Sequence, residues 1–181
     1  MGNYLLLATG ISHNIAVRVE SYINSSSVPL YSNVFNYVVT PYAPPPKVTP
    51  PSTGELYLVG DAGTSAVPAF TNWTNSAPGT GQQFTQISPT EYQITIAMGG
   101  GTPNDNPTGG AINDEFLFVP QIGSWTNKYQ APNNAAEANG GAFIYNGSPT
   151  TGGGNFYGAT VAGNYLIDVN FQTGIYTITK Q

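Results

Sequence analysis

The chain has 181 residues and a formal net charge of −5, and its four Lys and Arg residues provide no basic surface for nucleic acid or an anionic membrane. Only 7% of the residues are charged, against about 25% in typical proteins, while 40% are hydrophobic, so we expect a folded core beneath a polar, uncharged surface. The absence of cysteine excludes disulfides, thiolate zinc sites and cysteine nucleophiles.

The first forty residues contain three strand-like segments, at 4–8, 15–23 and 34–39. An immunoglobulin-like sandwich needs about seven strands, so three strands cannot bury a core by themselves. We therefore interpret residues 1–42 as the C-terminal strands of an incomplete immunoglobulin-like domain. Such a fragment is expected to leave an unpaired edge or to borrow a partner strand.

A proline-rich segment follows these strands. Residues 41–51 contain six prolines, which favours a semi-rigid, extended linker. We place the linker at residues 43–54 and a second domain at residues 55–181.

The second domain has seven strand-like segments separated by Gly, Pro and Asn, at 55–60, 83–87, 91–97, 114–120, 141–145, 164–170 and 174–180. No window combines helical periodicity with capping residues, so the pattern predicts an all-β sandwich. The last two segments are joined by Gln172–Gly174, which predicts a hairpin. Glycine-rich loops at 99–113 and 148–155 exceed the usual connection length and are candidates for functional or mobile segments.

Both tryptophans of the chain occupy predicted loops. Trp73 follows the first strand of the second domain, and Trp125 follows the strand at 114–120. Neutral glycans are bound by stacking on aromatic faces and by hydrogen bonds to hydroxyl groups, with few charges. Two loop tryptophans on an uncharged all-β domain therefore indicate carbohydrate binding.

The motifs of the chain follow a recognisable order. After the proline-rich segment come Leu-Val-Gly-Asp-Ala at 58–62, Phe-Leu-Phe-Val at 116–119 with Trp125 beyond it, and Gly-Asn-Tyr-Leu-Ile-Asp-Val-Asn-Phe at 163–171. This order resembles the SusE/SusF-like family of outer-membrane glycan-binding lipoproteins of Bacteroidetes. Upstream, Val17–Tyr22 is similar to the last strands of that family's immunoglobulin-like domain.

The resemblance implies a β-sandwich of the carbohydrate-binding-module type that binds a starch-like glucan without catalysis. It also implies a location on the extracellular side of the bacterial outer membrane, within a glycan uptake complex, and a membrane contact made only through a lipid anchor that this chain lacks. The chain is then a soluble fragment. It departs from the family pattern in having no lipoprotein cysteine, an incomplete immunoglobulin-like domain, and one binding domain where the family carries two or three.

The family binds glucan with an arc of aromatic rings and with Lys, Arg or Asn side chains that reach the hydroxyl groups. By this resemblance, the candidate glycan-binding residues are Trp73, Trp125, Asn127, Lys128 and Tyr129. Trp125 would provide a stacking ring, and Asn127 and Lys128 would reach hydroxyl groups. The alternatives are that Trp125 caps the end of the sandwich, that Lys128 is merely solvated, and that Trp73 folds back over the core.

The remaining polar residues favour neither a metal site nor a cofactor site, and we expect none. The run Asn104–Asn106, with Asp114 and Glu115, offers oxygen ligands but lacks the spacing of a calcium loop. His13 is the only histidine, so it cannot combine with another histidine or a cysteine in a zinc site. Asp61 follows a glycine and is typical of a turn.

The acidic residues argue against an enzyme. A glycosidase needs two carboxyl groups about 5–10 Å apart across a cleft, whereas the adjacent Asp114 and Glu115 point to opposite faces of a strand. Gly123–Trp125 lacks the rest of a serine nucleophile elbow. A glycan-binding module is therefore the first hypothesis, a structural or adhesin-type surface β domain the second, and a glycosidase or esterase the third. They predict exposed tryptophans, buried tryptophans, and a cleft with paired carboxylates, respectively.

Overall fold

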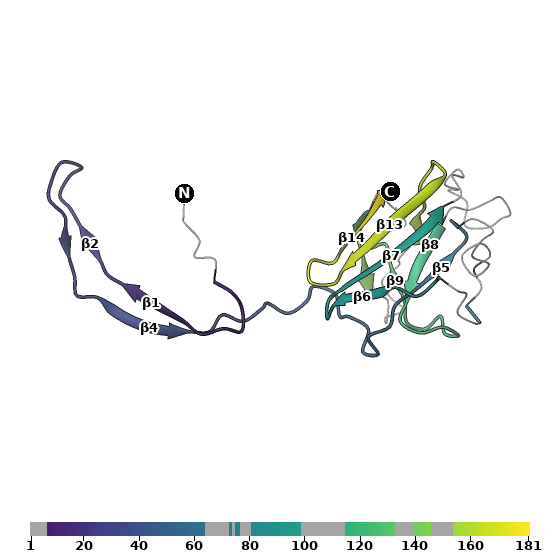
Figure 1. The fold of residues 1–181 in the computed structure, drawn as a ribbon, viewed down its shortest axis with the longest axis horizontal. Helices are drawn as coiled ribbons and strands as arrows, with labels where there is room; N and C mark the ends of the chain where they lie inside the picture. The colour runs from purple at the N-terminus through teal and green to yellow at the C-terminus, as the bar shows by residue number, and fades with distance from the viewer. Residues whose placement is uncertain are drawn as a thin grey trace. The chain divides into compact units, whose positions relative to one another are not determined.

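The computed structural model describes residues 7–63, 73, 75–76, 81–98, 115–132, 140–145 and 154–181, and all regular secondary structure in these residues is β-strand (Figure 1). The chain divides into two compact units, Met1–Pro45 and Pro46–Gln181. The predicted all-β class is confirmed. The predicted loop at 99–113 lies outside the described residues, as does most of the loop at 148–155.

The first unit is an antiparallel ribbon in which β1 pairs with β4 and β2 pairs with β3. Its strands are β1 (His13–Val17), β2 (Glu20–Ser21), β3 (Leu30–Tyr31) and β4 (Phe35–Val39). The predicted strand at 15–23 is thus divided, because Arg18 and Val19 interrupt it. The Arg18 guanidinium lies 4.0 Å from the centroid of the Tyr31 ring, and the Tyr31 hydroxyl donates to Glu20 Oε1 at 3.2 Å.

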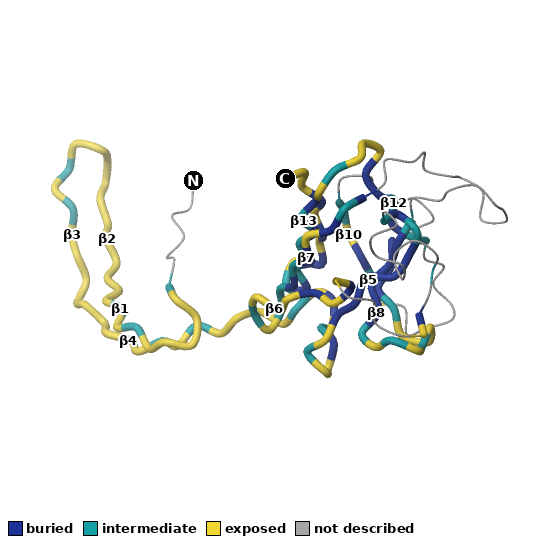
Figure 2. Tube along the Cα trace, turned by 45° about the vertical axis from the view of Figure 1, so that its right-hand side comes forward, coloured by how far each residue is buried: buried dark blue, intermediate teal, exposed yellow. Residues whose placement is uncertain are grey.

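One face of this ribbon is apolar and largely exposed, with Ile15 half-buried. Ile15 pairs with Tyr37 and Val17 pairs with Phe35, so these four side chains share a face. Nearly every described residue of the unit is exposed or half-buried (Figure 2). The ribbon has no core of its own within the described residues, since a two-stranded ribbon has no second layer to cover its apolar face.

The second unit contains two antiparallel sheets, with strand orders β10-β14-β13-β7-β6 in the first sheet and β11-β9-β8-β12 in the second, where β5 also pairs with β8. The strands are β5 (Tyr57–Gly60), β6 (Thr85–Ser88), β7 (Glu91–Met98), β8 (Glu115–Val119), β9 (Tyr129–Gln130), β10 (Gly140–Ala142), β11 (Ile144–Tyr145), β12 (Phe156–Tyr157), β13 (Gly163–Asn170) and β14 (Ile175–Lys180). The short strands β9 and β12 were not predicted.

The first sheet follows the period-two rule of a strand with one buried face. In β7, residues Tyr92 and Ile94 are buried while Thr95 is exposed. Their partners on β13 are Val169 and Ile167, which are also buried. Register and burial agree, so the apolar faces of both strands point toward the core.

The predicted hairpin at the C-terminus is confirmed. Strands β13 and β14 pair through their whole common length. At the turn, the Gly174 N–H donates to the Asn170 carbonyl at 2.8 Å, and the Thr173 N–H donates to Asn170 Oδ1 at 3.0 Å. Gly174 has φ of 66°, a left-handed conformation that glycine adopts without strain.

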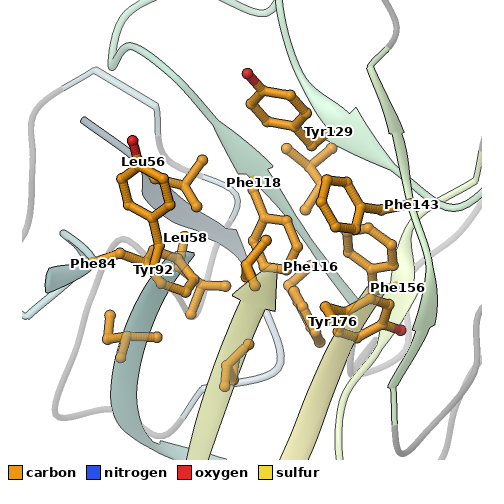
Figure 3. Close-up of a cluster of buried hydrophobic side chains, with 14 of the residues drawn as sticks. Leu56, Leu58, Phe84, Tyr92, Phe116, Phe118, Tyr129, Phe143, Phe156 and Tyr176 are labelled. Carbon is orange, nitrogen blue, oxygen red and sulfur yellow. The ribbon is translucent and has the colours of Figure 1, made fainter. Parts of the chain in front are cut away.

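Aromatic rings from both sheets form the core, with Phe118 of β8 at the middle of the cluster (Figure 3). Its ring centroid lies 4.8–6.4 Å from those of five other rings, Phe84, Phe116, Phe143, Phe156 and Tyr176. Tyr176 belongs to β14 of the first sheet, so this contact crosses between the sheets. Both faces of β5 and β8 are buried. A strand that alternates buried and exposed residues would bury only one face.

The chain crosses between the sheets at residues 82–88. The Leu58 N–H donates to the Gln82 carbonyl and the Phe84 N–H donates to the Leu56 carbonyl, both at 2.9 Å, so this segment first extends the β5 edge. It continues as β6, which pairs with β7 of the other sheet. The two sheets are therefore joined by a continuous stretch of paired backbone.

The start of the second unit packs on the sheets. The Val48 N–H donates to the Phe171 carbonyl at 3.2 Å, and the Val48 side chain is buried in the core. Lys47 and Val48, which we assigned to the linker, thus contact the C-terminal hairpin, and the division between the units lies before Pro46.

The ring cluster predicts a large effect of Phe118→Ala. Removing a buried Phe ring costs about 3–5 kcal/mol of unfolding free energy, because the cavity left in a close-packed core cannot fully collapse. Guanidinium denaturation measures this loss. The matched control is Ile87→Ala, whose exposed side chain should change stability by less than about 0.5 kcal/mol. A loss below about 1 kcal/mol for Phe118→Ala would contradict the central position of this ring.

Candidate functional site

The two tryptophans meet, although they are distant in the sequence. Their ring centroids are 6.4 Å apart and their planes are inclined by 42°, within the range of interacting aromatic pairs. Trp125 is 44% exposed, and Trp73 is half-buried against the core. The two residues, which we call the indole pair, form an apolar surface on a largely uncharged domain.

Trp73 is held in an uncommon backbone conformation. Its φ of 58° is the only positive value for a non-glycine residue in the described part of the chain, and for a bulky residue this is an outlier. The Trp73 backbone N–H donates to the Gly60 carbonyl at 3.1 Å, and its indole N–H donates to the Asp61 carboxylate. A conformation of this kind costs about 1–3 kcal/mol and persists where the surrounding contacts impose it.

Asp61 connects Trp73 to the start of β8. Its Oδ1 accepts the Glu115 N–H at 3.0 Å, and its own N–H donates to the Glu115 carbonyl at 2.9 Å. Burial raises the pKa of the Asp61 carboxyl above its usual value, while the hydrogen bonds from Glu115 and Trp73 act in the opposite direction. The aspartate that the sequence indicated as a turn former is therefore also a positioning residue for the indole of Trp73.

Asn75 joins the two tryptophan segments. This side chain is 7% exposed, its Nδ2 donates to the Ser124 carbonyl at 2.9 Å, and its Oδ1 accepts the Gly123 N–H at 3.0 Å. Both partners lie directly before Trp125. Sequence reasoning missed Asn75, because nothing in a loop rich in Asn and Thr distinguishes it from its neighbours.

The other three predicted binding residues lie next to Trp125 in the sequence but have different environments. Asn127 is exposed and Lys128 is half-buried. Tyr129 is only 1% exposed, and its hydroxyl donates to the Thr49 carbonyl at 3.0 Å. Its ring packs against Phe143 and Phe171 in the core. Tyr129 is thus mainly a core residue.

Asn127 and Tyr129 border a cleft of about 220 Å³. Its walls are Thr49, Pro50, Pro51, Ser52, Thr53, Pro120, Gln121, Asn127, Tyr129 and Tyr145. Tyr145 is 40% exposed, and its ring centroid lies 5.1 Å from that of Tyr129. Sequence reasoning missed this cleft, because residues 49–53 were assigned to the linker and Tyr145 lies at the end of a predicted strand.

Two further acidic side chains of the sheets, Glu115 and Asp168, pair with amides. Glu115 Oε2 accepts the Asn155 Nδ2 hydrogen bond at 2.8 Å, and Asp168 Oδ2 accepts that of Gln93 Nε2 at 2.6 Å. Within the described ranges, no three His, Cys, Asp or Glu side chains come close enough together to hold a metal ion. The possible calcium ligands at 104–106 and 114 lie outside those ranges.

His13 belongs to the ribbon, where its Nε2–H donates to the Ala8 carbonyl at 2.9 Å. No helix in the described part of the chain has the length and apolar character needed to span a bilayer.

Comparisons with known proteins found no matching family model, no similar curated protein and no similar solved structure.

The bridging role of Asn75 predicts that Asn75→Ala separates the indole pair. Removing the amide leaves the Ser124 carbonyl and the Gly123 N–H without this partner, which costs about 1–3 kcal/mol of stability. Circular dichroism should show the loss of the exciton couplet of the indole pair, and denaturation should show the loss of stability. Asn127→Ala is the control, because an exposed side chain should affect neither. An unchanged couplet in Asn75→Ala would contradict the bridge.

The raised pKa of Asp61 predicts a pH dependence of stability. A carboxyl whose pKa is higher in the folded than in the unfolded protein binds more protons when folded, so lowering the pH through this window increases the unfolding free energy. The window extends from the raised pKa down to the unfolded value of about 3.9. The unfolding free energy of the wild type minus that of Asp61→Asn should therefore rise as the pH falls from 7 to 4. If the unfolding free energies of the wild type and Asp61→Asn change with pH in parallel, burial of Asp61 has no such effect.

Proposed function

We propose that the second unit is a non-catalytic module that binds a neutral oligosaccharide or polysaccharide on the indole pair. The observation that carries this proposal is the contact between Trp73 and Trp125, with Trp125 substantially exposed. The apolar C–H face of a sugar ring packs against an indole face, and its hydroxyl groups remain available to nearby polar groups. Asn127 and Lys128 follow Trp125 closely enough to provide such groups.

The way the pair is held supports a binding role. Trp73 is fixed through its backbone N–H, its indole N–H and a constrained φ, and the Trp125 loop is fixed by Asn75. Binding then requires little ordering of these rings, and preorganisation of this kind increases affinity. Residues in strained backbone conformations, such as Trp73, cluster at ligand-binding and active sites.

The wider setting of the module is proposed from the resemblance to SusE/SusF-like lipoproteins. On that basis the two sheets are a β-sandwich of the carbohydrate-binding-module type, and the ribbon is the C-terminal part of an immunoglobulin-like domain. The ligand is then a starch-like glucan, captured at the extracellular side of the bacterial outer membrane for an uptake complex. A lipid anchor outside this chain would provide the attachment to the membrane.

A structural or adhesin-type surface domain is the second candidate, and one observation favours it. Trp73 is half-buried and packs on the core, as a ring would that served only to cover the end of the sheets. On that account the indole pair contributes to stability and binds no ligand.

Glycan binding predicts a specific loss in Trp125→Ala. Affinity electrophoresis and calorimetry with maltoheptaose, amylopectin, levan and xylan should show binding of at least one of these by the wild type. Because an aromatic contact contributes about 0.5–1.5 kcal/mol, the variant should bind about two- to tenfold more weakly or worse. Tyr37→Ala, on the ribbon, is the control and should bind normally. A folded protein that binds none of the four carbohydrates would favour the structural candidate.

A further inference from the structure

We infer that the cleft beside Tyr145 is a second sugar-binding subsite, so that the ligand is an extended chain that contacts both the indole pair and this cleft. The inference rests on the proposed function and adds to it the length and binding mode of the ligand. The cleft is lined by residues 49–53 together with Pro120, Gln121, Asn127, Tyr129 and Tyr145.

One loop connects the cleft to the indole pair. Pro120 and Gln121 at its start and Asn127 near its end border the cleft, while Trp125 between them contacts Trp73. Trp125 and Asn127 are two residues apart, so their Cα atoms are separated by no more than about 7 Å. The cleft wall at Asn127 and the indole pair are therefore close enough for one ligand of several sugar units to span both.

The chemistry of the cleft fits a neutral sugar unit. Among its described lining residues none is charged, so it offers no counter-ion to a phosphate or a carboxylate. Ser52 and Thr53 carry hydroxyl groups, and Gln121 and Asn127 carry amides, so the cleft can both donate hydrogen bonds to sugar hydroxyls and accept them. Tyr145 exposes part of its ring for packing against a C–H face.

The size of the cleft points to part of a ligand rather than to a whole one. Its volume of about 220 Å³ is below the range of roughly 300–1,000 Å³ of pockets that enclose drug-sized molecules. A cleft of this size takes one unit of a chain whose remaining units lie outside it. The indole pair is the adjoining surface on which they can lie.

The walls are held in place before any ligand binds. The Tyr129 hydroxyl binds the Thr49 carbonyl, the Thr53 Oγ1 donates to the Pro120 carbonyl at 3.5 Å, and the Gly54 N–H donates to the Pro51 carbonyl at 3.1 Å. Proline rings restrict the backbone of the same wall further. This explains why a proline-rich segment packs on the sheets here instead of remaining a free linker.

The test compares short and long ligands of the polymer that binds: maltose and maltoheptaose for amylopectin, or the corresponding disaccharide and heptasaccharide of levan or xylan. Calorimetry of the wild type should give tighter binding of the heptasaccharide. Tyr145→Ala should weaken heptasaccharide binding about two- to tenfold and leave disaccharide binding on the indole pair unchanged. Tyr145→Phe, which keeps the ring, is the matched control and should bind like the wild type.

Gln121→Ala provides a second variant that does not alter the Tyr145–Tyr129 contact, and it should weaken heptasaccharide binding in the same direction while leaving disaccharide binding unchanged. Trp125→Ala should weaken binding of both ligands. Equal heptasaccharide affinity in the wild type, Tyr145→Ala and Gln121→Ala would overturn the second subsite while leaving the glycan-binding module intact. Failure of the folded wild type to bind any of the carbohydrates would instead overturn the proposed function, and the subsite with it.

Aromatic side chains beside a groove also bind proline-rich peptides, and decaproline tests that alternative. No binding is expected. Saturable decaproline binding that is lost in Tyr145→Ala, together with an unchanged heptasaccharide affinity, would reassign the cleft to a peptide.

Discussion

The packing of aromatic rings around β8 is the constraint on which the second unit depends. Phe118 contacts rings from both sheets, so β8 can occupy only one position and one register. The strand begins at Glu115, whose backbone binds Asp61 beside Trp73, and it ends directly before the loop that carries Trp125. Trp73 therefore lies beside the start of β8, and Trp125 is carried by the loop that follows its end. Loops held on a rigid scaffold in this way are common among binding proteins.

Much of the fold could be predicted from the sequence where strands are long and have one buried face. Large apolar residues recur at every second position along β7 and β13, and the turn between β13 and β14 has the required glycine. The two-residue strands β9 and β12 could not be predicted, because two residues contain no period. The packing of residues 47–51 in the second unit could not be predicted either. Prolines favour an extended backbone both in a free linker and in a segment that packs on a core.

The candidate site was predictable only in its separate parts. Both tryptophans were recognisable as loop residues, but their contact depends on the φ of Trp73 and on hydrogen bonds from Asn75 that cross between distant segments. Tyr129 illustrates the opposite case. Proximity to Trp125 in the sequence made it a candidate for the site, whereas its burial places it in the core and its hydroxyl supports the far wall of the cleft.

The uncharged lining of the cleft has a consequence for the conditions in which a ligand could be held there. Dissolved ions weaken attractions between charges over a distance of about 8–10 Å at physiological salt, but they have little effect on ring packing or on hydrogen bonds between neutral groups. None of the described residues around the cleft carries a charge that salt could screen. A neutral ligand held by such a surface would keep nearly the same affinity between low and physiological salt.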